Sequence, residues 1–301
     1  MERFTLYILP LLLLVSCTFP TARSEHRQHD SLPDNARRLI EAYPKEIAGY
    51  QDNMIIFADS TRLTFNDGVQ RTIEEMHLQQ DVKDIFFQEY DTTLFPPDYG
   101  YDPGRYRSAE FFDKIYGSTY EEVVANLVYV NWCPSFGCKP LLFNSRAGAA
   151  EALKRVSDEF EQHPELAEWV IDAQSFNYRP IFGINRKSPH GYGIAVDIAV
   201  ARSHYWRFSY PDASESTELK YQNLIDMRVV EIFEKHGFIW GGRWYHFDTM
   251  HFEYRPEMFT KPTQVVEQAA EECVDKTETE AENNSSEEAS TTEALSPETI
   301  S

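Results

Sequence analysis

The sequence predicts an α+β fold built on a mostly antiparallel sheet flanked by helices. Segments with strand character and segments with helical periodicity follow one another in mixed order and are joined by short links. The regular alternation of strand and helix that builds a parallel sheet is not seen, and no internal repeat is visible. A hydrophobic content of 42% over 301 residues supplies enough apolar surface for a substantial core.

The first 17 residues have the features of an export signal. After one early arginine, the chain carries an apolar run of about 12 residues, which is shorter than the about 20 that a membrane-spanning helix needs. The segment from Leu14 to Cys17 is similar to the lipobox of bacterial lipoproteins, so we expect a signal peptide that ends at a lipidated Cys17. The alternative is an ordinary signal peptide cleaved near Ala22. Either reading predicts an exported chain, and lipidation predicts a periplasmic lipoprotein anchored to a membrane of the bacterial cell envelope.

Two polar segments flank the part of the chain that we expect to fold. Residues 18–33 read as a linker, and residues 261–301 read as an acidic disordered tail because they hold too few large apolar residues to offset the entropy of ordering. The net charge is −21, but eleven Asp and Glu against one Lys follow Gln264, so about half of the excess lies in the tail. An acidic chain without a basic stripe argues against nucleic acid as a partner.

Residues 34–119 are predicted to form a helical and hairpin region that packs on the domain that follows it. A helix begins near Asp34, and the strand-like runs "NMIIFA" and "RLTF" are separated by "DST", which indicates a hairpin. The segment "SAEFFDKIYG" reads as a helix that begins after Ser108 and ends at Gly117. This region carries no recognisable chemistry and has the character of a scaffold. The alternative is that Asp102 and Arg105 border a substrate groove.

Residues 120–260 are predicted to form the main domain. Ser118 and Glu121 have the spacing of a capping box ahead of "VVANLVYVNW", whose second half favours a strand. The clearest helix follows in "SRAGAAEALKRVSDEFEQH", and its apolar stripe consists of Ala149, Leu153, Val156 and Phe160. A further helix, "DMRVVEIFEKHG", precedes the last strand-rich segment.

Cys133 and Cys138 flank "PSFG" between two apolar runs. In an oxidising compartment this pair is expected to form a disulfide. The competing interpretation is half of a zinc site, but a second cysteine pair is missing because Cys273 stands alone in the tail. A structural pair is therefore favoured.

The stretch "SPHGYGIAVDIAV" places a carboxylate inside an apolar strand. Alternation puts Asp197 on the same face as small alanines. An unpaired buried carboxylate is costly, so Asp197 is expected to meet a cation, an arginine or a set of hydrogen-bond donors. Gly191 and Gly193 permit a tight turn that folds His190 back toward Asp197.

The later stretch "WYHFDTMHFEY" adds a second histidine and a second carboxylate. Two histidines and one carboxylate, with a fourth position left to water, form the composition of a catalytic zinc site. His251 is the second histidine, and Asp248 is a candidate general base. Arg179 lies in an otherwise apolar segment and is a candidate donor to the charge that develops on an attacked carbonyl.

Taken singly, these residues are more typical of structural positions. An isolated histidine or aspartate in a strand usually satisfies a local partner, and Trp244 beside a glycine pair belongs either to the core or to the wall of a substrate cleft. Only the combined pattern distinguishes a site from such separate structural roles.

The combined pattern resembles the VanY-like D-alanyl-D-alanine carboxypeptidase family of zinc peptidases. The resemblance is carried by "SPHGYGIAVDI" and "GFIWGGRWYHFDTMHFEY" within residues 120–258. It implies the hedgehog/DD-peptidase fold and a zinc peptidase domain over residues 120–260. The roles that it implies are zinc ligands at His190, Asp197 and His251, a base at Asp248, a transition-state arginine at Arg179, and contacts to the substrate at Ser188 and Trp244. Only eight residues separate Arg179 from Ser188, fewer than in many relatives.

The function that this resemblance implies is hydrolysis of peptidoglycan stem peptides, with Zn2+ as cofactor and the terminal D-Ala-D-Ala bond as the leading target. An L-Ala-D-Glu endopeptidase or a dipeptidase would use the same metal site. The alternative from another class is a non-catalytic lipoprotein that binds cell-wall peptides in the same cleft.

Overall fold

The computed structural model describes residues 32–181 and 186–261. The predicted signal peptide with Cys17, nearly all of the predicted linker, and the tail beyond Lys261 lie outside the described residues. The described residues belong to one compact unit. No helix in the described ranges is long and apolar enough to cross a bilayer.

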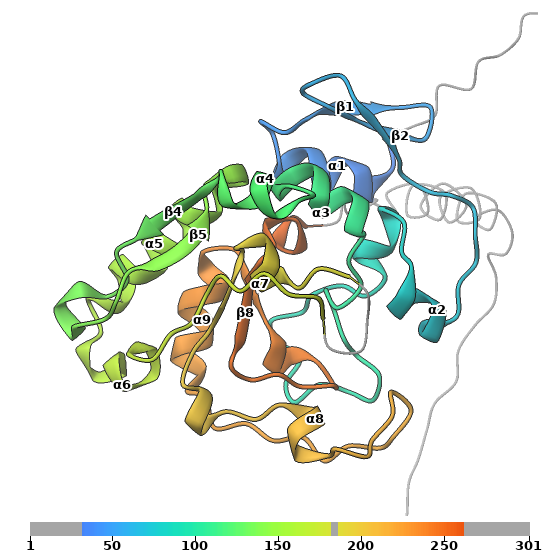
Figure 1. The fold of residues 1–301 in the computed structure, drawn as a ribbon. Coiled ribbons are helices and arrows are strands. Elements are labelled where there is room, and N and C mark those ends of the chain that lie inside the picture. The colour runs from blue at the N-terminus through green and yellow to red at the C-terminus, as the bar shows by residue number, and fades with distance from the viewer. Residues whose placement is uncertain (1–31, 182–185, 262–301) are drawn as a thin grey trace, which may run out of the picture. The chain divides into compact units, whose positions relative to one another are not determined.

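Short helices make up much of the described chain (Figure 1). The α-helices are α1 (Asp34–Ala42), α2 (Ile73–Leu78), α3 (Ala109–Tyr116), α4 (Tyr120–Val124), α5 (Ala149–Phe160), α6 (Ala167–Val170), α7 (Pro189–Tyr192), α8 (Trp206–Ser209) and α9 (Met227–Lys235). Single turns of 3-10 helix lie between them, at Lys83–Phe86, Pro134–Phe136, Arg146–Gly148, Pro164–Leu166, Val200–Arg202, Gly241–Arg243 and Pro256–Phe259.

The strands form three small sheets, all antiparallel within the described residues. The first sheet has the order β1 (Ile47–Gln51), β2 (Met54–Phe57), β3 (Arg62–Thr64), the second pairs β4 (Leu127–Val130) with β5 (Leu141–Asn144), and the third has the order β6 (Ala195–Asp197), β8 (His251–Tyr254), β7 (Phe238–Trp240). The α+β class and the antiparallel pairing are confirmed. The expectation of one larger sheet is wrong, because turns and 3-10 segments interrupt the strands after three to five residues.

One continuous hydrophobic core joins the two regions that the sequence divided at residue 119. It contains side chains of α1 and α3 from the first region together with α5, α9, β7 and β8 from the second. The predicted stripe of α5 is completely buried, and α5 packs against α9 and against β4 and β5. The shared core fixes the N-terminal region against the sheet that carries the site.

Two local predictions differ from the structure by small shifts. The capping box at the start of α4 is made by Thr119 and Glu122, one residue later than the pair predicted, because Glu122 reaches back to the amides of both Ser118 and Thr119. The β6 strand is only three residues long and ends at Asp197. Ala199 then takes a left-handed backbone with φ 47°, so the expected continuation of the strand to residue 200 does not form.

Candidate metal centre

Three side chains predicted as metal ligands come together from three elements. His190 lies in α7, Asp197 ends β6, and His251 begins β8. The antiparallel register sets Asp197 directly opposite His251, so the sheet itself brings these two residues together across 54 positions of sequence. Asp197 therefore lies at the end of its strand, where its side chain opens to a cleft, rather than in the apolar middle of the sheet.

The turn before β6 delivers His190. Ser188 caps α7 by accepting a hydrogen bond from the backbone N–H of His190, and Gly193 ends the helix with φ 71°. A Cβ at Gly193 would lie 2.6 Å from Leu127 Cδ2, so this left-handed position requires glycine for space as well as for conformation. The predicted role of the glycine-rich turn is confirmed.

The three ligand atoms form a nearly equilateral triangle. His190 Nε2 lies 3.1 Å from Asp197 Oδ1 and 3.2 Å from His251 Nδ1, and His251 Nδ1 lies 3.1 Å from Asp197 Oδ1. Tetrahedral ligands about 2.1 Å from a zinc ion are about 3.4 Å apart. The triangle is therefore close to the size that a bound zinc ion requires, and no other group of three or more His, Cys, Asp or Glu in the described ranges has its ligand atoms so close together.

The outer nitrogen of each imidazole already has an acceptor. His190 Nδ1 lies 2.7 Å from the carbonyl oxygen of Ser175, and His251 Nε2 lies 3.0 Å from Glu253 Oε2. Each acceptor holds a proton on the outer nitrogen, so the inner nitrogens carry lone pairs that point at one another and at Asp197. Lone pairs so close together need positive charge between them, which a proton on His251 or a bound divalent metal can supply.

The charge balance at His251 points in the same direction. Burial alone would lower the pKa of His251, but the carboxylates of Asp197 and Glu253 outweigh burial and raise it to about 10. The centre thus attracts positive charge strongly. For Asp197, burial opposes ionisation, yet the two histidines hold its pKa below the usual value.

Glu253 is the functional residue whose role the sequence did not reveal. Its side chain is fully buried, accepts hydrogen bonds from Arg107 at 2.9 and 2.6 Å, and accepts another from Arg255 at 2.8 Å. Burial would raise the pKa of Glu253, but Arg107, His251 and Arg255 outweigh burial and keep it well below its usual value. A carboxylate in this position orients His251 and increases its basicity. The glutamate was visible in the "HFEY" motif, but nothing in the sequence identified Arg107 as its partner.

Asp248 lies beside the triangle with an unusual environment. Its Oδ1 atom is buried and has no hydrogen-bond partner, although its backbone is fixed by hydrogen bonds from its own N–H to Gly241 and from His251 to its carbonyl. Burial, together with the negative charge of Asp197, raises the pKa of Asp248 to about 7. A buried carboxylate oxygen without a protein partner is suited to exchange a proton with a bound molecule.

The other predicted residues line the same cleft with unequal roles. Arg179 is exposed, and its positive charge acts to lower the pKa of Asp248. Ser188 is buried, and its hydroxyl is used as the cap of α7. Trp244 is nearly buried, donates its indole N–H to the carbonyl of Pro103 at 2.7 Å, and packs its ring 5.7 Å from that of His251. Trp244 is thus both a core residue and part of the cleft wall.

The cleft has a volume of about 610 Å³ and contains all three triangle residues and Asp248. One wall comes from the N-terminal region through Arg105 and Arg107, and another comes from Trp206 and Phe208 of α8. Of the pair that the alternative interpretation placed at a groove, Arg105 lines this cleft, whereas Asp102 does not. The N-terminal region is therefore part of the site and not only a scaffold.

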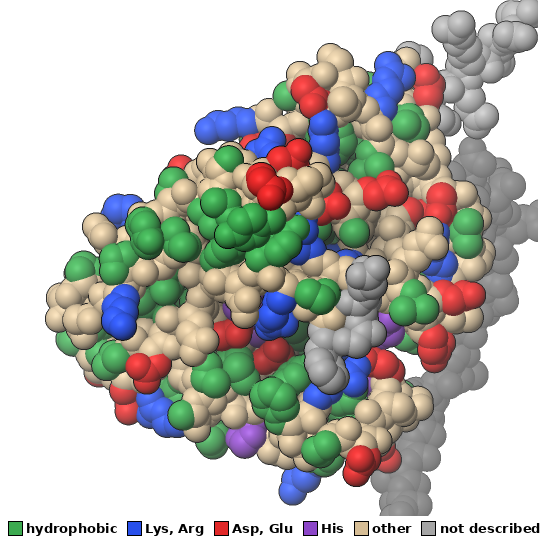
Figure 2. Space-filling model, in the orientation of Figure 1, with side chains coloured by type: hydrophobic (Ala, Val, Ile, Leu, Met, Phe, Trp, Pro, Cys, Tyr) green, Lys and Arg blue, Asp and Glu red, His purple; other side chains and the backbone are tan. Residues whose placement is uncertain are grey.

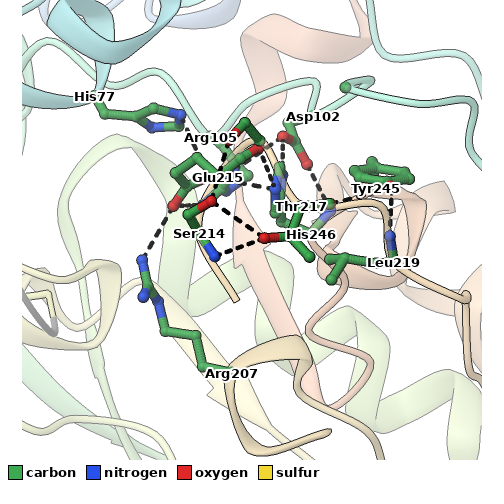
Figure 3. Close-up of polar contacts among 12 residues, drawn as sticks. His77, Asp102, Arg105, Arg207, Ser214, Glu215, Thr217, Leu219, Tyr245 and His246 are labelled. Carbon is green, nitrogen blue, oxygen red and sulfur yellow. Dashed lines mark hydrogen bonds and ion pairs between the residues drawn. The ribbon is translucent and has the colours of Figure 1, made fainter. Parts of the chain in front are cut away.

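A buried network of charged groups holds the cleft walls together (Figure 3). Asp102 accepts hydrogen bonds from Arg105 and from both the backbone and the ring of His246. Glu215, in the loop after α8, binds Arg105 at 3.0 Å and Arg207 at 3.0 Å. Burial would raise the pKa of Asp102, but Arg105 and His246 outweigh it and keep this carboxylate ionised. The network ties the loop after α8 to the N-terminal region.

Cys133 and Cys138 are both free thiols in the structure. Cys133 begins the turn with a left-handed φ of 37°, and its backbone N–H binds the hydroxyl of Ser157, while Cys138 Sγ faces the carbonyl of Val170. Burial raises the pKa of Cys133 to about 12, so this thiol is not activated for reaction. The predicted disulfide is not formed here, and it stays a prediction for the oxidised protein.

The cleft holds an imidazole pair and a carboxylate that converge on one point, with a second buried carboxylate beside them, which is the composition found in metallohydrolase sites. Residues 183–254 match the family model described as D-alanyl-D-alanine carboxypeptidase, which supports the VanY-like resemblance of the sequence. The match covers about a quarter of the chain. It includes the three triangle residues, Asp248 and Glu253, whereas Arg179 lies before it. Searches of curated proteins and of solved structures found no match to the chain.

Proposed function

We propose that this protein is a zinc-dependent peptidase that hydrolyses peptidoglycan stem peptides, with the terminal D-Ala-D-Ala bond as the leading substrate. The observation that carries the proposal is the convergence of His190, Asp197 and His251 inside the segment that matches the carboxypeptidase family. The α+β architecture with antiparallel sheets is compatible with the hedgehog/DD-peptidase fold, which we propose for the domain.

Each residue of the site has a role in this proposal. His190 Nε2, Asp197 Oδ1 and His251 Nδ1 hold the metal, with Ser175 and Glu253 fixing the two rings. When bound, zinc supplies a Lewis acid that lowers the pKa of water and polarises a carbonyl. Asp248 Oδ1 takes a proton from the attacking water and passes it to the leaving amine.

Arg179 and the aromatic wall orient the substrate in the proposed reaction. The Arg179 guanidinium faces the cleft and donates hydrogen bonds to the carbonyl oxygen as negative charge develops on it. Trp244 and Trp206 give the cleft apolar surface against which the peptide can pack and from which water is excluded. The hydroxyl of Ser188 is occupied as a helix cap, so its contact with substrate is a secondary part of the proposal.

The test is digestion of purified muropeptides, read by mass spectrometry, together with a zinc assay of the same preparation. Loss of one terminal D-Ala from pentapeptide stems, abolished by a chelator and restored by zinc, is the expected result. Cleavage between L-Ala and D-Glu, or of free dipeptides only, would replace the carboxypeptidase by one of the related activities. Binding of stem peptides without any cleavage would support the non-catalytic lipoprotein instead.

The general-base role of Asp248 has its own test. The Asp248→Ala variant is expected to keep stoichiometric zinc and to lose turnover by at least about a hundredfold, because a positioned acid–base group contributes about 10²–10⁴ in rate. Asp158→Ala removes an exposed carboxylate of α5 that pairs with Lys154 and serves as the matched control with unchanged activity. Full activity in Asp248→Ala would refute the role.

We also propose that the mature protein is a periplasmic lipoprotein anchored through Cys17. The support is the apolar leader that ends in the lipobox-like "LVSC". Metabolic labelling with a fatty-acid analogue should mark the wild-type chain and leave Cys17→Ser unlabelled. An unlabelled wild-type chain with an amino terminus near Ala22 would instead establish an ordinary signal peptide.

A further inference from the structure

Arg186 is a buried arginine that forms no ion pair with a carboxylate of the described residues. Its side chain is 8% exposed, and its Nη1 donates to the carbonyl of Arg107 at 2.9 Å and to the side chain of Gln80. Its Nε is buried and has no hydrogen-bond partner. Both partners of the guanidinium are neutral oxygens, so its positive charge is solvated by dipoles alone.

The other buried arginines of the described residues are all compensated. Each forms an ion pair with at least one glutamate, namely Arg38 with Glu89, Arg107 with Glu253, Arg243 with Glu234, and Arg255 with Glu253 and Glu257. Arg186 is the exception in this set. A buried charge without a counterion is strongly unfavourable, so Arg186 requires a charge partner that the described residues do not supply.

Neighbouring positive charges make the uncompensated charge of Arg186 still less favourable. Burial, together with the positive charge of Arg107, lowers the pKa of Arg186 to about 9. The group nevertheless remains protonated at neutral pH. The negative charge of Glu253 raises the pKa of Arg186, but that glutamate is already shared by Arg107, Arg255 and His251.

Arg186 lines a small pocket of about 260 Å³ beside the metal cleft. The described residues that line it are Tyr178, Arg179, Pro180, Arg186 and Lys187, and three of these five are cationic and none is acidic. Lys187 is balanced by Asp113 at 3.0 Å, whereas Arg179 makes no ion pair with any described residue. On the face drawn in Figure 2, Lys and Arg side chains lie in the central part, where α7 lies in Figure 1.

The backbone joins this pocket to the catalytic cleft. Pro180 pairs with Lys187 across an antiparallel bridge, and the N–H of Ser188 donates to the carbonyl of Arg179 at 3.0 Å. Arg179 lines both the pocket and the cleft. An extended peptide bound at the metal would therefore place a neighbouring side chain or terminus at the pocket.

We propose that the pocket around Arg186 binds a second carboxylate of the substrate peptide, one that is not part of the scissile bond. The planar guanidinium of arginine matches a carboxylate with two parallel hydrogen bonds. Peptides of the class proposed above carry such free carboxylates along the stem. The inference rests on the proposed function. It adds that the enzyme selects peptides with a free carboxylate over amidated peptides.

The first experiment compares two peptides that differ only in one group. A stem peptide with a free α-carboxylate on its D-Glu residue and the same peptide with that carboxylate amidated are both given to the wild-type zinc enzyme. We expect the amidated peptide to have a KM at least about tenfold higher with a similar kcat, because charge-assisted hydrogen bonds distinguish the two. A second pair of peptides carries the free or amidated carboxylate on the third stem residue instead. Equal KM values within both pairs, measured on the wild-type enzyme alone, would overturn the proposal.

The second experiment uses variants of Arg186. Arg186→Gln should raise the KM for the acidic peptide by about tenfold or more and leave the KM for the amidated peptide unchanged, while Arg186→Lys should recover part of the difference. Arg155→Gln, which removes an exposed arginine of α5, is the matched control. A variant that changes both peptides equally would assign Arg186 a structural role and overturn the proposal.

A binding measurement separates this inference from the proposed catalytic function. Glutarate, its neutral diamide and inorganic phosphate are titrated into the wild type and Arg186→Gln by calorimetry, with no turnover required. Glutarate bound more tightly than the diamide, with affinity lost in the variant, supports the pocket even if the wild type cleaves neither peptide and the catalytic proposal fails. Equal affinity for glutarate in both proteins, or tighter binding of phosphate, would overturn the carboxylate site.

Discussion

Glu253 shows how much of this site depends on one residue that touches no substrate. Its carboxylate joins the metal centre to two buried arginines, so it orients His251 while it balances the charges of Arg107 and Arg255. Removing its charge therefore affects metal binding and folding together. A second buried glutamate, Glu257, pairs with Arg255 and Tyr43 but does not touch a histidine, which allows the two effects to be separated.

We expect Glu253→Gln to weaken zinc binding by about 10–100-fold, because an amide does not increase the basicity of His251 as a carboxylate does. Glu257→Gln should lower the free energy of unfolding by breaking a buried ion pair, yet leave zinc affinity unchanged. Zinc affinity is measured by competition with a chromophoric chelator, and stability by urea unfolding of the metal-free proteins. Equal zinc affinity in Glu253→Gln and the wild type would contradict the orienting role.

Among the elements, the 3-10 turn Gly241–Arg243 contacts the backbone of Asp248 directly and fixes its position. The N–H of Asp248 donates to the carbonyl of Gly241 at 3.0 Å. A Cβ at position 241 would lie 2.4 Å from the backbone oxygen of Asp248 and 2.9 Å from Trp244 Cζ3. The absence of a side chain at Gly241 thus lets the turn pack directly on the segment that presents the proposed base.

The Gly241→Ala variant should therefore bind zinc normally but lose about a hundredfold in kcat/KM, since a displacement of about 1 Å at a reacting group has an effect of this size. Gly49→Ala in β1 is the control, because a Cβ there meets nothing within 4 Å. Kinetics on the best muropeptide substrate and zinc content are measured on both variants. Loss of zinc together with activity in Gly241→Ala would show that the turn supports the whole centre and not Asp248 alone.

At the scale of the molecule, the N-terminal region and residues 120–261 belong to one compact unit. They share a hydrophobic core, and the region before residue 120 supplies Arg107 to Glu253 and Asp102 to His246. The family match begins at residue 183, so the partners of the matched residues extend far outside the matched segment. A peptidase domain cut at residue 120 would retain the metal ligands without the groups that hold them.

A chain of residues 120–261 is accordingly expected to fail to fold cooperatively, because it exposes the core side chains that pack on α1 and α3 and leaves Glu253 with fewer counterions. The matched control is a chain of residues 32–261, which keeps every described element. Calorimetric unfolding and the dispersion of amide NMR signals distinguish the two. A sharp thermal transition in the shorter chain would show that the N-terminal region is an independent addition.

The sequence by itself determined the chemistry of the centre and the strongest local elements. The residue types at 190, 197, 248 and 251, the tight turn at Gly193 and the buried stripe of α5 could all be predicted, because each depends on spacing over a few positions or on a family motif. Short-range signals were less accurate where alternatives differ little in energy, as in the capping box that forms one residue later than predicted.

Only the tertiary structure decided which distant groups meet. The strand register that sets Asp197 against His251, the approach of Arg107 to Glu253 across 146 positions, and the isolation of Arg186 among buried arginines follow from packing. No local pattern encodes them, because the energy of a buried charge depends on every group that surrounds it in space and not on its neighbours in the chain.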